Sequence, residues 1–338
     1  MQGGAERVIS VLSKKFCKMG LDVSILYYYD FEIFYDIHPD VKLFCVEKST
    51  DSHNKIKNLL WIRKFFKQNA DVVISFMASL NIFAILAHMG LKTPIIVADR
   101  SDPYIVPSNF LVRKTRDFLY RFADRIVLQT ERNLNYFSKK IKAKGSVIFN
   151  PTDIGEYKGK ALKTPKSKKI VSVGRLIPSK NYEMLIYAFS KLTDAYPEYT
   201  LTIYGDGQSH NKLNSLVAEL GLNEKVFLPG NEKNVFEKTK DAELFVLPSN
   251  IEGMPNALIE AMCLGLPVIS TNVSGAADFI KNGKNGLIID CNDLSQLVLA
   301  MEKMLKDEEF RTNCAEQAIN IIKLVDTDVI VDKWLDLI

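Results

Sequence analysis

Apolar segments of strand length alternate with segments of helical periodicity along nearly the whole chain, in two consecutive series. The strand-like segments are 23–29, 41–46, 72–75, 95–98, 125–128 and 146–149 in the first series, and 170–173, 200–204, 226–228, 244–247, 268–270 and 286–289 in the second. Helix-like segments separate them, among them 55–69, 112–122, 130–141 and 256–264. This alternation predicts an α/β protein with a doubly wound parallel sheet in each series.

A polar stretch that contains Gly, Pro and many Lys interrupts the alternation at 151–169, as a linker between domains does. We therefore predict two tandem Rossmann-like domains that face a cleft, residues 1–155 and residues 156–325. In such sheets the ligand binds outside the carboxyl ends of the strands.

A glycine pair, Gly3 and Gly4, stands directly before the first helix-like segment. Such a pair normally turns out of a preceding strand, and only Met1 and Gln2 precede it here. We therefore expect the first strand of the N-terminal domain to be missing from the chain.

The stretch 249–265, SNIEGMPNALIEAMCLG, follows a strand of the second series and continues into a helix. Its two carboxylates are Glu252 in the loop and Glu260 about one turn into the helix that Pro255 and Asn256 open. Because the amides at a helix N-terminus attract anions, the pair suits a ligand with a diphosphate and several hydroxyls. A solvated surface loop is an equally weighted alternative.

Two further loops follow strands of the second series. Arg175 and Lys180 supply two cations for a phosphate after the strand at 170–173, the alternative being a solvated charge pair. Gly205 and Gly207 follow the strand at 200–204 and allow the backbone to approach a ligand, although a plain turn explains them as well.

Taken together, Gly174-Arg175 with Lys180-Asn181, Gly205-Asp206-Gly207 and the E-x7-E pair Glu252 and Glu260 resemble the donor half of retaining glycosyltransferases with the GT-B fold, specifically glycosyltransferase family 4. The glycine pair before the first helix resembles the acceptor-half loop of that family. The resemblance implies transfer of a hexose or N-acetylhexosamine from a nucleotide diphosphate sugar, a UDP-sugar, to a growing and lipid-linked cell-surface saccharide. It also implies retention of anomeric configuration, without a metal or a cofactor.

Position by position, the resemblance implies that Arg175 and Lys180 bind the diphosphate, that Glu252 holds sugar hydroxyls and that Glu260 holds the ribose. The backbone positions it implies are Gly4, Gly174, Gly205, Gly253, Met254, Pro255, Asn256 and Ala257 around the phosphates, and Val226, Phe227 and Leu228 around the base. In this family the departing phosphate is thought to help deprotonate the incoming hydroxyl. The protein then has to position the substrates and stabilise the charge of the leaving group, and it does not have to supply a strong base.

The chain departs from many family members at 97–103, VADRSDP, where those members carry a histidine. This segment looks like a subgroup that acts on lipid-linked or cell-surface saccharides, which assigns Asp99 and Arg100 to orient the sugar or the acceptor. Asp102 capping the turn before Pro103 is an equally weighted explanation. The family also implies that a final helix, 326–338, crosses back to the first domain. We interpret Asp326 and Asp328 as a cap of that helix rather than as a metal-binding D-x-D.

The two halves of the chain differ in charge. Residues 1–150 carry 23 Lys and Arg against 14 Asp and Glu, a net charge of +9, and residues 151–338 carry 21 against 26, a net charge of −5. Two basic and apolar stretches, 53–67 and 110–121, suit peripheral contact with an anionic membrane. The alternative for each is an amphipathic helix packed on the sheet. Nucleic acid is a poor partner, because the second half is acidic and carries no known binding module.

The cysteines, the histidines and the length of the apolar runs narrow the possible classes of protein. Five scattered cysteines favour reduced thiols, and four histidines without paired spacing argue against a His-based metal site. No apolar run reaches the ~18–20 residues of a membrane span, and no signal peptide is visible. We expect a cytoplasmic protein, peripheral on the inner face of the membrane. Two rival functions stay open: a nucleotide-sugar epimerase on the same fold, and a catalytically impaired partner subunit or truncated fragment.

Overall fold

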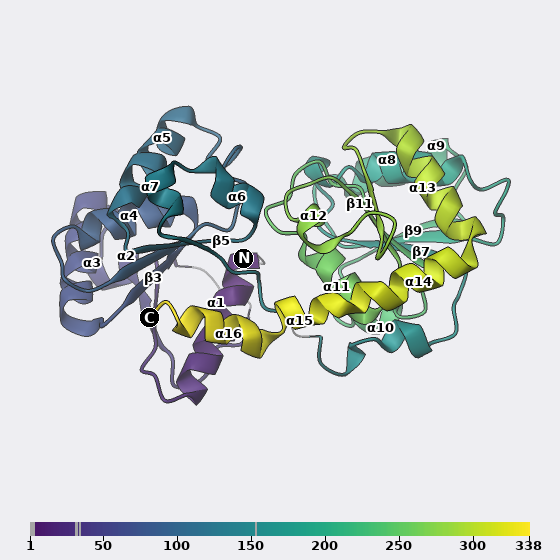
Figure 1. Ribbon diagram of the computed structural model, residues 1–338. Coiled ribbons are helices and arrows are strands. Elements are labelled where there is room, and N and C mark those ends of the chain that lie inside the picture. The colour runs from purple at the N-terminus through teal and green to yellow at the C-terminus, as the bar shows by residue number, and fades with distance from the viewer. Residues whose placement is uncertain (1–3, 31–32, 34, 153) are drawn as a thin grey trace. The chain divides into compact units, whose positions relative to one another are not determined.

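The chain divides into two α/β units (Figure 1). The computed structural model describes residues 4–30, 33, 35–152 and 154–338. Unit 1 comprises Met1–Pro151 and Val325–Ile338, and unit 2 comprises Thr152–Leu324. Each unit contains parallel strands flanked by helices, which confirms the predicted pair of Rossmann-like domains. The first boundary falls four residues before the predicted one.

Unit 2 is built on one six-stranded sheet with the order β12-β11-β10-β7-β8-β9, and every neighbouring pair is parallel. Its strands are β7 (Lys169–Val173), β8 (Thr200–Tyr204), β9 (Val226–Gly230), β10 (Leu244–Leu247), β11 (Val268–Thr271) and β12 (Leu287–Ile289). The chain runs outward from β7 to β9 and then returns to β10 on the other side of β7. The direction of winding therefore reverses between β7 and β10, where sheets of this type bind their ligands.

Helices cover both faces of this sheet. They are α8 (Tyr182–Ser190), α9 (His210–Glu219), α10 (Val235–Thr239), α11 (Asn256–Leu264), α12 (Ala276–Phe279), α13 (Leu294–Lys306) and α14 (Glu308–Ala318). The short α15 (Ile322–Val325) spans the boundary between the two units in the sequence. All four residues of β10 are buried, which explains why this strand reads as a continuous apolar run. The predicted linker contains two 3-10 turns, Gly155–Tyr157 and Lys160–Lys163. It is fastened to the unit, because the Gly159 amide donates to the Cys263 carbonyl at 2.9 Å.

Unit 1 contains two separate parallel sheets in its described part. The first pairs β1 (Ser24–Tyr27) with β2 (Lys42–Cys45), and the second has the order β3 (Val73–Phe76), β4 (Ile95–Ala98), β5 (Arg125–Leu128) and β6 (Gly145–Val147). Sequence reasoning predicted one sheet here. The expectation about a strand before the glycine pair concerns residues 1–3, which lie outside the described residues.

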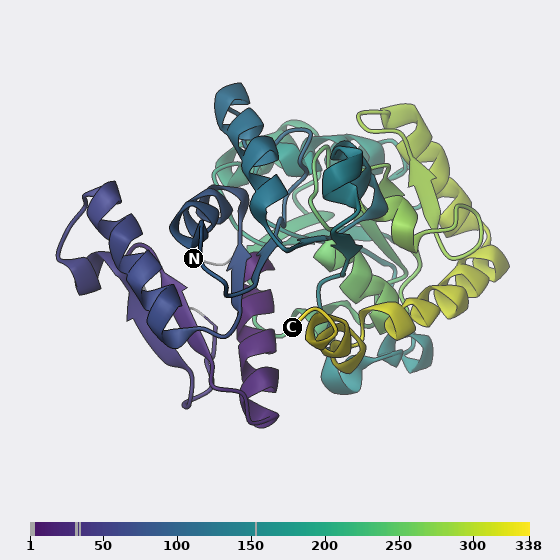
Figure 2. The same cartoon turned by 60° about the vertical axis from the view of Figure 1, so that its left-hand side comes forward.

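The helices of unit 1 are α1 (Gly4–Lys18), α2 (Val46–Thr50), α3 (Lys55–Asn69), α4 (Ala78–His88), α5 (Phe110–Leu119), α6 (Glu131–Tyr136), α7 (Lys139–Lys142) and α16 (Thr327–Leu335). Figure 2 shows α3 beside the two-stranded sheet, and the rings of Phe44 on β2 and Phe65 on α3 meet at 4.9 Å. None of the described helices combines the length and the apolarity needed to cross a bilayer.

The C-terminal helix α16 packs on unit 1 beside α1 (Figure 2). Ile330, Val331 and Trp334 share one buried apolar cluster with Val8 and Leu12 of α1. Lys15 of α1 forms an ion pair with Asp328. The Asp326 carboxylate accepts from the Asp328 amide at 3.0 Å, so the predicted helix cap is confirmed. The final helix therefore belongs to unit 1 although its sequence follows unit 2.

Candidate active site

Lys180 and Glu252 form an ion pair at the switch point of the unit 2 sheet. Lys180 ends a 3-10 turn (Pro178–Lys180) after β7, and Glu252 lies in the loop after the neighbouring strand β10. Lys180 Nζ lies 2.5 Å from Glu252 Oε1, and the two side chains are only 16% and 10% exposed. The Ser249 hydroxyl donates to the same carboxylate oxygen at 2.7 Å. Sequence reasoning predicted the acid and the cation, but it did not predict this direct contact or the role of Ser249.

The two loops that carry this pair are tied together by further hydrogen bonds. The Asn250 amide donates to the Ser179 carbonyl at 2.8 Å. The Asn181 side-chain amide donates to Asn250 Oδ1 at 3.3 Å and to Asn292 Oδ1 at 3.1 Å. Because these bonds link the residues adjacent to Lys180 and near Glu252, the ion pair sits on a cross-linked platform rather than on two free loops.

Gly205 allows the loop after β8 to approach the loop after β7. Its φ is +133°, and a Cβ at this position would lie 2.0 Å from the Gly174 carbonyl oxygen. The Gly174 amide donates to the Tyr204 carbonyl at 2.9 Å, and the Leu176 amide to the Asp206 carbonyl at 2.9 Å. Glycine is required here by this close contact as well as by its dihedral angle.

We expect Gly205→Ala to displace the loop that carries Lys180 and to weaken nucleotide binding by at least about tenfold, because the clashing atom is backbone and cannot rotate away. Titration calorimetry with UDP measures this effect. Gly221→Ala is the control, since that glycine also has a positive φ but its Cβ would meet no atom within 4 Å. Equal losses in the two variants would show that dihedral strain, not the loop contact, is responsible.

The N-terminus of α11 lies directly after the Glu252 loop. Pro255 precedes the first helical residue and provides no side-chain cap, while the Ile259 amide donates to the Pro255 carbonyl at 3.1 Å. The amides of Ala257 and Leu258 donate no hydrogen bond within the described part of the chain. These N–H groups and the helix dipole favour an anion at this end of α11. Pro255 itself has no N–H, so its predicted contribution to phosphate binding cannot be an amide hydrogen bond.

Arg175 and Glu260, the other charged residues predicted for the site in unit 2, differ in their exposure to solvent. Arg175 is exposed and forms no ion pair with any described residue. Glu260 is half-buried on α11, one turn after the helix begins.

The predicted base-binding segment lies on β9, one of the two edge strands of the sheet. Val226 stands at the amino end of β9 and is packed in the core, whereas Phe227 is 44% exposed. The carboxyl edge of β9 is at Gly230, so Leu228 lies closer to the ligand-binding edge than Val226 does.

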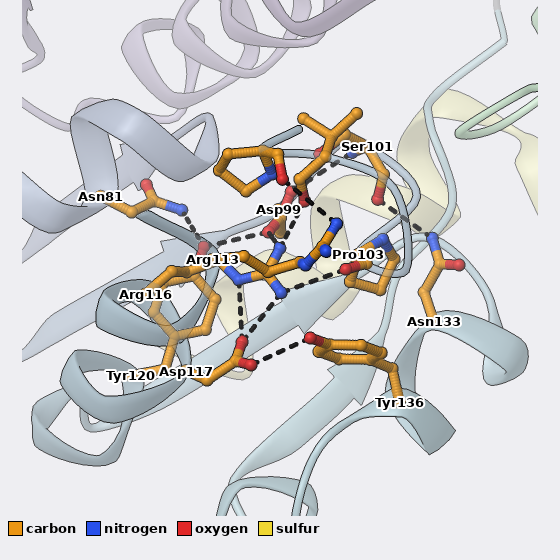
Figure 3. A network of polar contacts seen from close by, with 12 residues as sticks. Asn81, Asp99, Ser101, Pro103, Arg113, Arg116, Asp117, Tyr120, Asn133 and Tyr136 are labelled. Carbon is orange, nitrogen blue, oxygen red and sulfur yellow. Dashed lines mark hydrogen bonds and ion pairs between the residues drawn. The ribbon is translucent and has the colours of Figure 1, made fainter. Parts of the chain in front are cut away.

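In unit 1, the side chain of Asp99 is fully buried and engaged by protein partners (Figure 3). It follows β4, and its Oδ1 accepts from the Ser101 hydroxyl at 2.7 Å. Its Oδ2 accepts from the Tyr120 hydroxyl at 3.1 Å and lies 3.5 Å from Arg116 Nη1. Burial raises the pKa of Asp99 despite these partners. Gly4, also predicted to approach the phosphate, is the first residue of α1.

Arg100 is held between aromatic rings. Its guanidinium carbon lies 5.5 Å from the ring centre of Phe76 and 5.4 Å from that of Trp334. Its Nη1 donates to Asn150 Oδ1 at 2.9 Å, and burial lowers its pKa to about 9. Asp102 caps the following turn, because its carboxylate accepts from the Tyr104 amide at 2.9 Å. In this structure Asp99 and Arg100 therefore position the loop after β4 through contacts within the protein.

Comparison with known proteins identifies the family. Residues 153–321 match the family model of glycosyl transferases group 1, which covers half of the chain and the whole platform described above. A Campylobacter jejuni enzyme is 32% identical over 99% of this chain and 95% of its own length. The chain belongs to the group 1 glycosyl transferases.

Two relatives of this glycosyltransferase are named for transfer to lipid-linked saccharides. The Campylobacter jejuni relative is named an α-1,4-N-acetyl-D-galactosaminyltransferase for a GalNAc-GalNAc-diNAcBac-PP-undecaprenol acceptor. A second enzyme of that organism, an N-acetylgalactosamine-N,N′-diacetylbacillosaminyl-diphospho-undecaprenol 4-α-N-acetylgalactosaminyltransferase, is 30% identical over 91% of this chain and 88% of its own length. The Anabaena protein HepE, solved in complex with UDP, matches 99% of this chain and 96% of its own with a TM-score of 0.83 and 18% identity. The fold is therefore GT-B, as predicted.

The two basic stretches of the glycosyltransferase are only partly solvated. In the second stretch Arg116 is fully buried and is not part of an exposed cationic face, whereas Phe110, Leu111 and Phe118 are exposed. In the first stretch, Arg63 donates to the Ala87 and Met89 carbonyls at 3.0 and 2.5 Å, and Ile62 and Phe66 are buried in the core of unit 1. The α3 helix thus shows the packed amphipathic arrangement that was the alternative interpretation.

Proposed function

We propose that this glycosyltransferase transfers a hexose or N-acetylhexosamine from a UDP-sugar to a saccharide carried on a lipid diphosphate, with retention of anomeric configuration. The observation that carries the proposal is the Lys180–Glu252 pair beside the open N-terminus of α11, at the switch point of the unit 2 sheet. The names of the two Campylobacter relatives support the lipid-linked acceptor, and the UDP complex of HepE supports the nucleotide.

In this proposal the positive charges of unit 2 hold the donor diphosphate. Lys180 exchanges part of its contact with Glu252 for a phosphate oxygen, and the exposed Arg175 supplies a planar second cation. The amides of Ala257 and Leu258 bind the distal phosphate at the helix N-terminus. Two cations and two amides provide the charge stabilisation that the leaving diphosphate needs, so we propose transfer that does not depend on a metal ion.

The two carboxylates bind the hydroxyls of the donor. Glu252 orients the sugar because it stands beside Lys180 and so beside the diphosphate–sugar linkage. Glu260, one turn into α11, accepts from the ribose hydroxyls on the other side of the phosphates. The backbone of β9 near Leu228 lies beyond β8 and is assigned to the base.

The reaction is a substitution at the anomeric carbon. The bond from this carbon to the phosphate oxygen breaks, and the acceptor hydroxyl forms a new bond on the same face. The hydroxyl proton passes to the leaving phosphate oxygen, and UDP is released. The protein acts by holding the two substrates in position and by stabilising the charge of the diphosphate. Gly4, Asp99 and Arg100 of unit 1 are assigned to the acceptor side, the latter two through the position of their loop.

The decisive experiment combines UDP titration calorimetry with a transfer assay. The purified chain is titrated with UDP and then incubated with UDP-sugars and lipid-linked saccharide extracted from membranes. We expect UDP binding and transfer of an intact sugar. Absence of UDP binding would contradict the donor site. Interconversion of UDP-sugars without transfer would favour an epimerase, which the named relatives do not support, and UDP binding without any turnover would favour the impaired subunit.

Ser249→Ala tests the support of Glu252. We expect a loss of about five- to tenfold in kcat/KM for transfer, because one hydrogen bond from a neutral hydroxyl to the carboxylate is removed while Lys180 remains. UDP affinity should not change, since UDP lacks the sugar that Glu252 holds. Ser172→Ala is a control with a hydroxyl in the same unit that donates to the Val246 carbonyl at 2.6 Å. A weaker UDP affinity in Ser249→Ala would instead assign Ser249 to the diphosphate.

A further inference from the structure

Exposed apolar side chains concentrate on α5 and the loop before it. Of the 26 large apolar residues that are exposed in the described part of the chain, eight lie within residues 104–122. Leu111 is 73% exposed, Phe110 59% and Phe118 52%. Proteins that stay in water rarely expose a contiguous patch of such side chains unless it binds something.

These residues share one face of α5 with cations. The 3-10 turn Tyr120–Phe122 continues α5 directly. Leu111, Lys114 and Phe118 of α5 and Arg121 and Phe122 of this turn follow one another at intervals of three or four positions, which places them along one side. The Arg121 guanidinium lies 4.4 Å from the centre of the Phe118 ring, and Phe118 and Phe122 meet at 5.7 Å. Lys114 Nζ lies 5.5 Å from the ring of Phe110. Apolar and cationic groups are therefore mixed on this face. Such a mixture suits an interface at which the rings leave water while the charged ends stay in it.

The loop before α5 is fixed with its side chains outward. Arg113 Nη1 donates to the carbonyls of Tyr104, Ile105 and Pro107 at 3.0, 3.2 and 3.3 Å. The buried Arg116 donates to the carbonyls of Pro103 and Val106 (Figure 3). Because two arginines of α5 hold the backbone of the loop from one side, the side chains of Tyr104, Ile105 and Val106 stay 39–46% exposed. The loop and the helix thus form one preassembled surface.

The charge around this surface is strongly positive. Residues 103–144 contain ten Lys and Arg against three Asp and Glu, a net charge of +7. Of the three acids, Asp117 is held by Arg116 and by the Tyr136 hydroxyl, and Asp124 accepts from the Ile95 amide. An anionic bilayer matches both features, since rings enter the headgroup boundary while Lys and Arg meet lipid phosphates.

We propose that the α5 face, defined by Phe110, Leu111, Lys114, Phe118, Arg121 and Phe122, docks on the surface of an anionic lipid bilayer. The α3 helix is not the docking element, because its apolar side is largely used for packing and its exposed apolar residues, Ile56 and Leu60, lack the aromatic–cation pairs. Docking through α5 brings a lipid-linked acceptor to unit 1, and this benefit, though not the binding itself, rests on the proposed function.

The test is cosedimentation of the full chain with vesicles of phosphatidylcholine alone or mixed with phosphatidylglycerol. We expect binding to the anionic vesicles that weakens as salt is added. Leu111→Ser with Phe118→Ser should lower the partition coefficient by at least about tenfold, and so should Lys114→Glu with Arg121→Glu. The matched controls are Ile56→Ser with Leu60→Ser and Lys57→Glu with Lys64→Glu on α3, whose side chains are similarly exposed, and these should bind nearly as the native chain does.

Several results would overturn the proposal. These are equal binding to neutral vesicles, an equal loss in the α3 controls, or no vesicle binding by a chain that still binds UDP. A dimer in solution that the Leu111 and Phe118 substitutions convert to a monomer, without vesicle binding, would assign the surface to a second copy of the chain. UDP calorimetry on every variant keeps the two proposals apart, because the donor site belongs to unit 2 and needs no membrane.

Discussion

Lys180→Ala should lower kcat/KM for sugar transfer by about 100- to 1,000-fold, because it removes a cation that stabilises the leaving diphosphate. Unlike Ser249→Ala, it should also weaken the binding of UDP, which carries the same diphosphate. Glu252→Gln should reduce transfer to a similar extent with little effect on UDP affinity, because the carboxylate is assigned to the sugar. The measurements are initial transfer rates and UDP calorimetry on the same preparations.

The control for Lys180 is another lysine–glutamate pair of unit 2. Lys212 Nζ lies 2.8 Å from Glu183 Oε1, but the side chains are 69% and 37% exposed. An exposed pair of this kind contributes little to stability, so Lys212→Ala should leave transfer and UDP binding unchanged. If Lys180→Ala kept near-normal turnover, the diphosphate would have to be held by Arg175 and the α11 amides alone. If Glu252→Gln lowered UDP affinity as strongly as Lys180→Ala, Glu252 would act by fixing the lysine rather than the sugar.

The strands whose bounds sequence reasoning predicted to the residue are 95–98, 125–128, 200–204 and 244–247. Three or four residues of each are buried, and the resulting segments, which are mostly apolar, are visible without tertiary information. The donor loops were predictable for a related reason. Their residues follow strands, and parallel strands bring their carboxyl ends to one edge of the sheet.

The failures concern tertiary contacts that leave no local pattern. Residues 130–141 read as one helix, yet Phe137 is extended and buried, with its ring stacked 5.7 Å from that of Tyr120. The helix α14 was missed because it faces the core with small residues such as Cys314, Ala315 and Ala318, which weaken the apolar period. Ser249 carries a possible signal, since it lies three residues before Glu252, but serine in a loop is too common to select by sequence.

Sequence reasoning also did not predict that Arg116 is buried. Its replacement is expected to have the largest effect on stability. Each of its three side-chain nitrogens has a partner: Nε and Nη2 donate to Asp117 at 3.0 and 2.8 Å, Nη1 and Nη2 donate to the loop carbonyls, and Nη1 pairs with Asp99 (Figure 3). Arg116 and Asp99 are both fully buried. Arg116→Met should therefore lower the free energy of unfolding of unit 1 by about 3–5 kcal/mol, because it leaves Asp99 buried without its cation.

Tryptophan fluorescence, followed as the urea concentration is raised, reports the unfolding of unit 1 alone. The chain has two tryptophans, Trp61 on α3 and Trp334 on α16, and both belong to unit 1. The signal thus follows unit 1 even where the two units unfold separately. Arg125→Met is the control, because among the described residues this exposed arginine donates only to the Asp124 carbonyl, at 3.3 Å. Its loss should change the free energy of unfolding by less than about 0.5 kcal/mol.

The pH dependence of the Arg116→Met deficit distinguishes an unpaired charge from lost packing. Burial already raises the pKa of Asp99 in the native protein, and removal of the guanidinium should raise it further. A carboxyl whose pKa is higher in the folded state than in the unfolded state lowers the free energy of unfolding once the pH rises above its unfolded-state pKa. Below the unfolded-state pKa this loss of stability vanishes. The deficit should therefore be largest at neutral pH and shrink toward about pH 4.

Asp99→Asn in the Arg116→Met background should remove this dependence. A deficit that stayed constant with pH would attribute the role of Arg116 to packing against Tyr136 and Phe137, whose ring centres lie 5.2 Å from its guanidinium carbon.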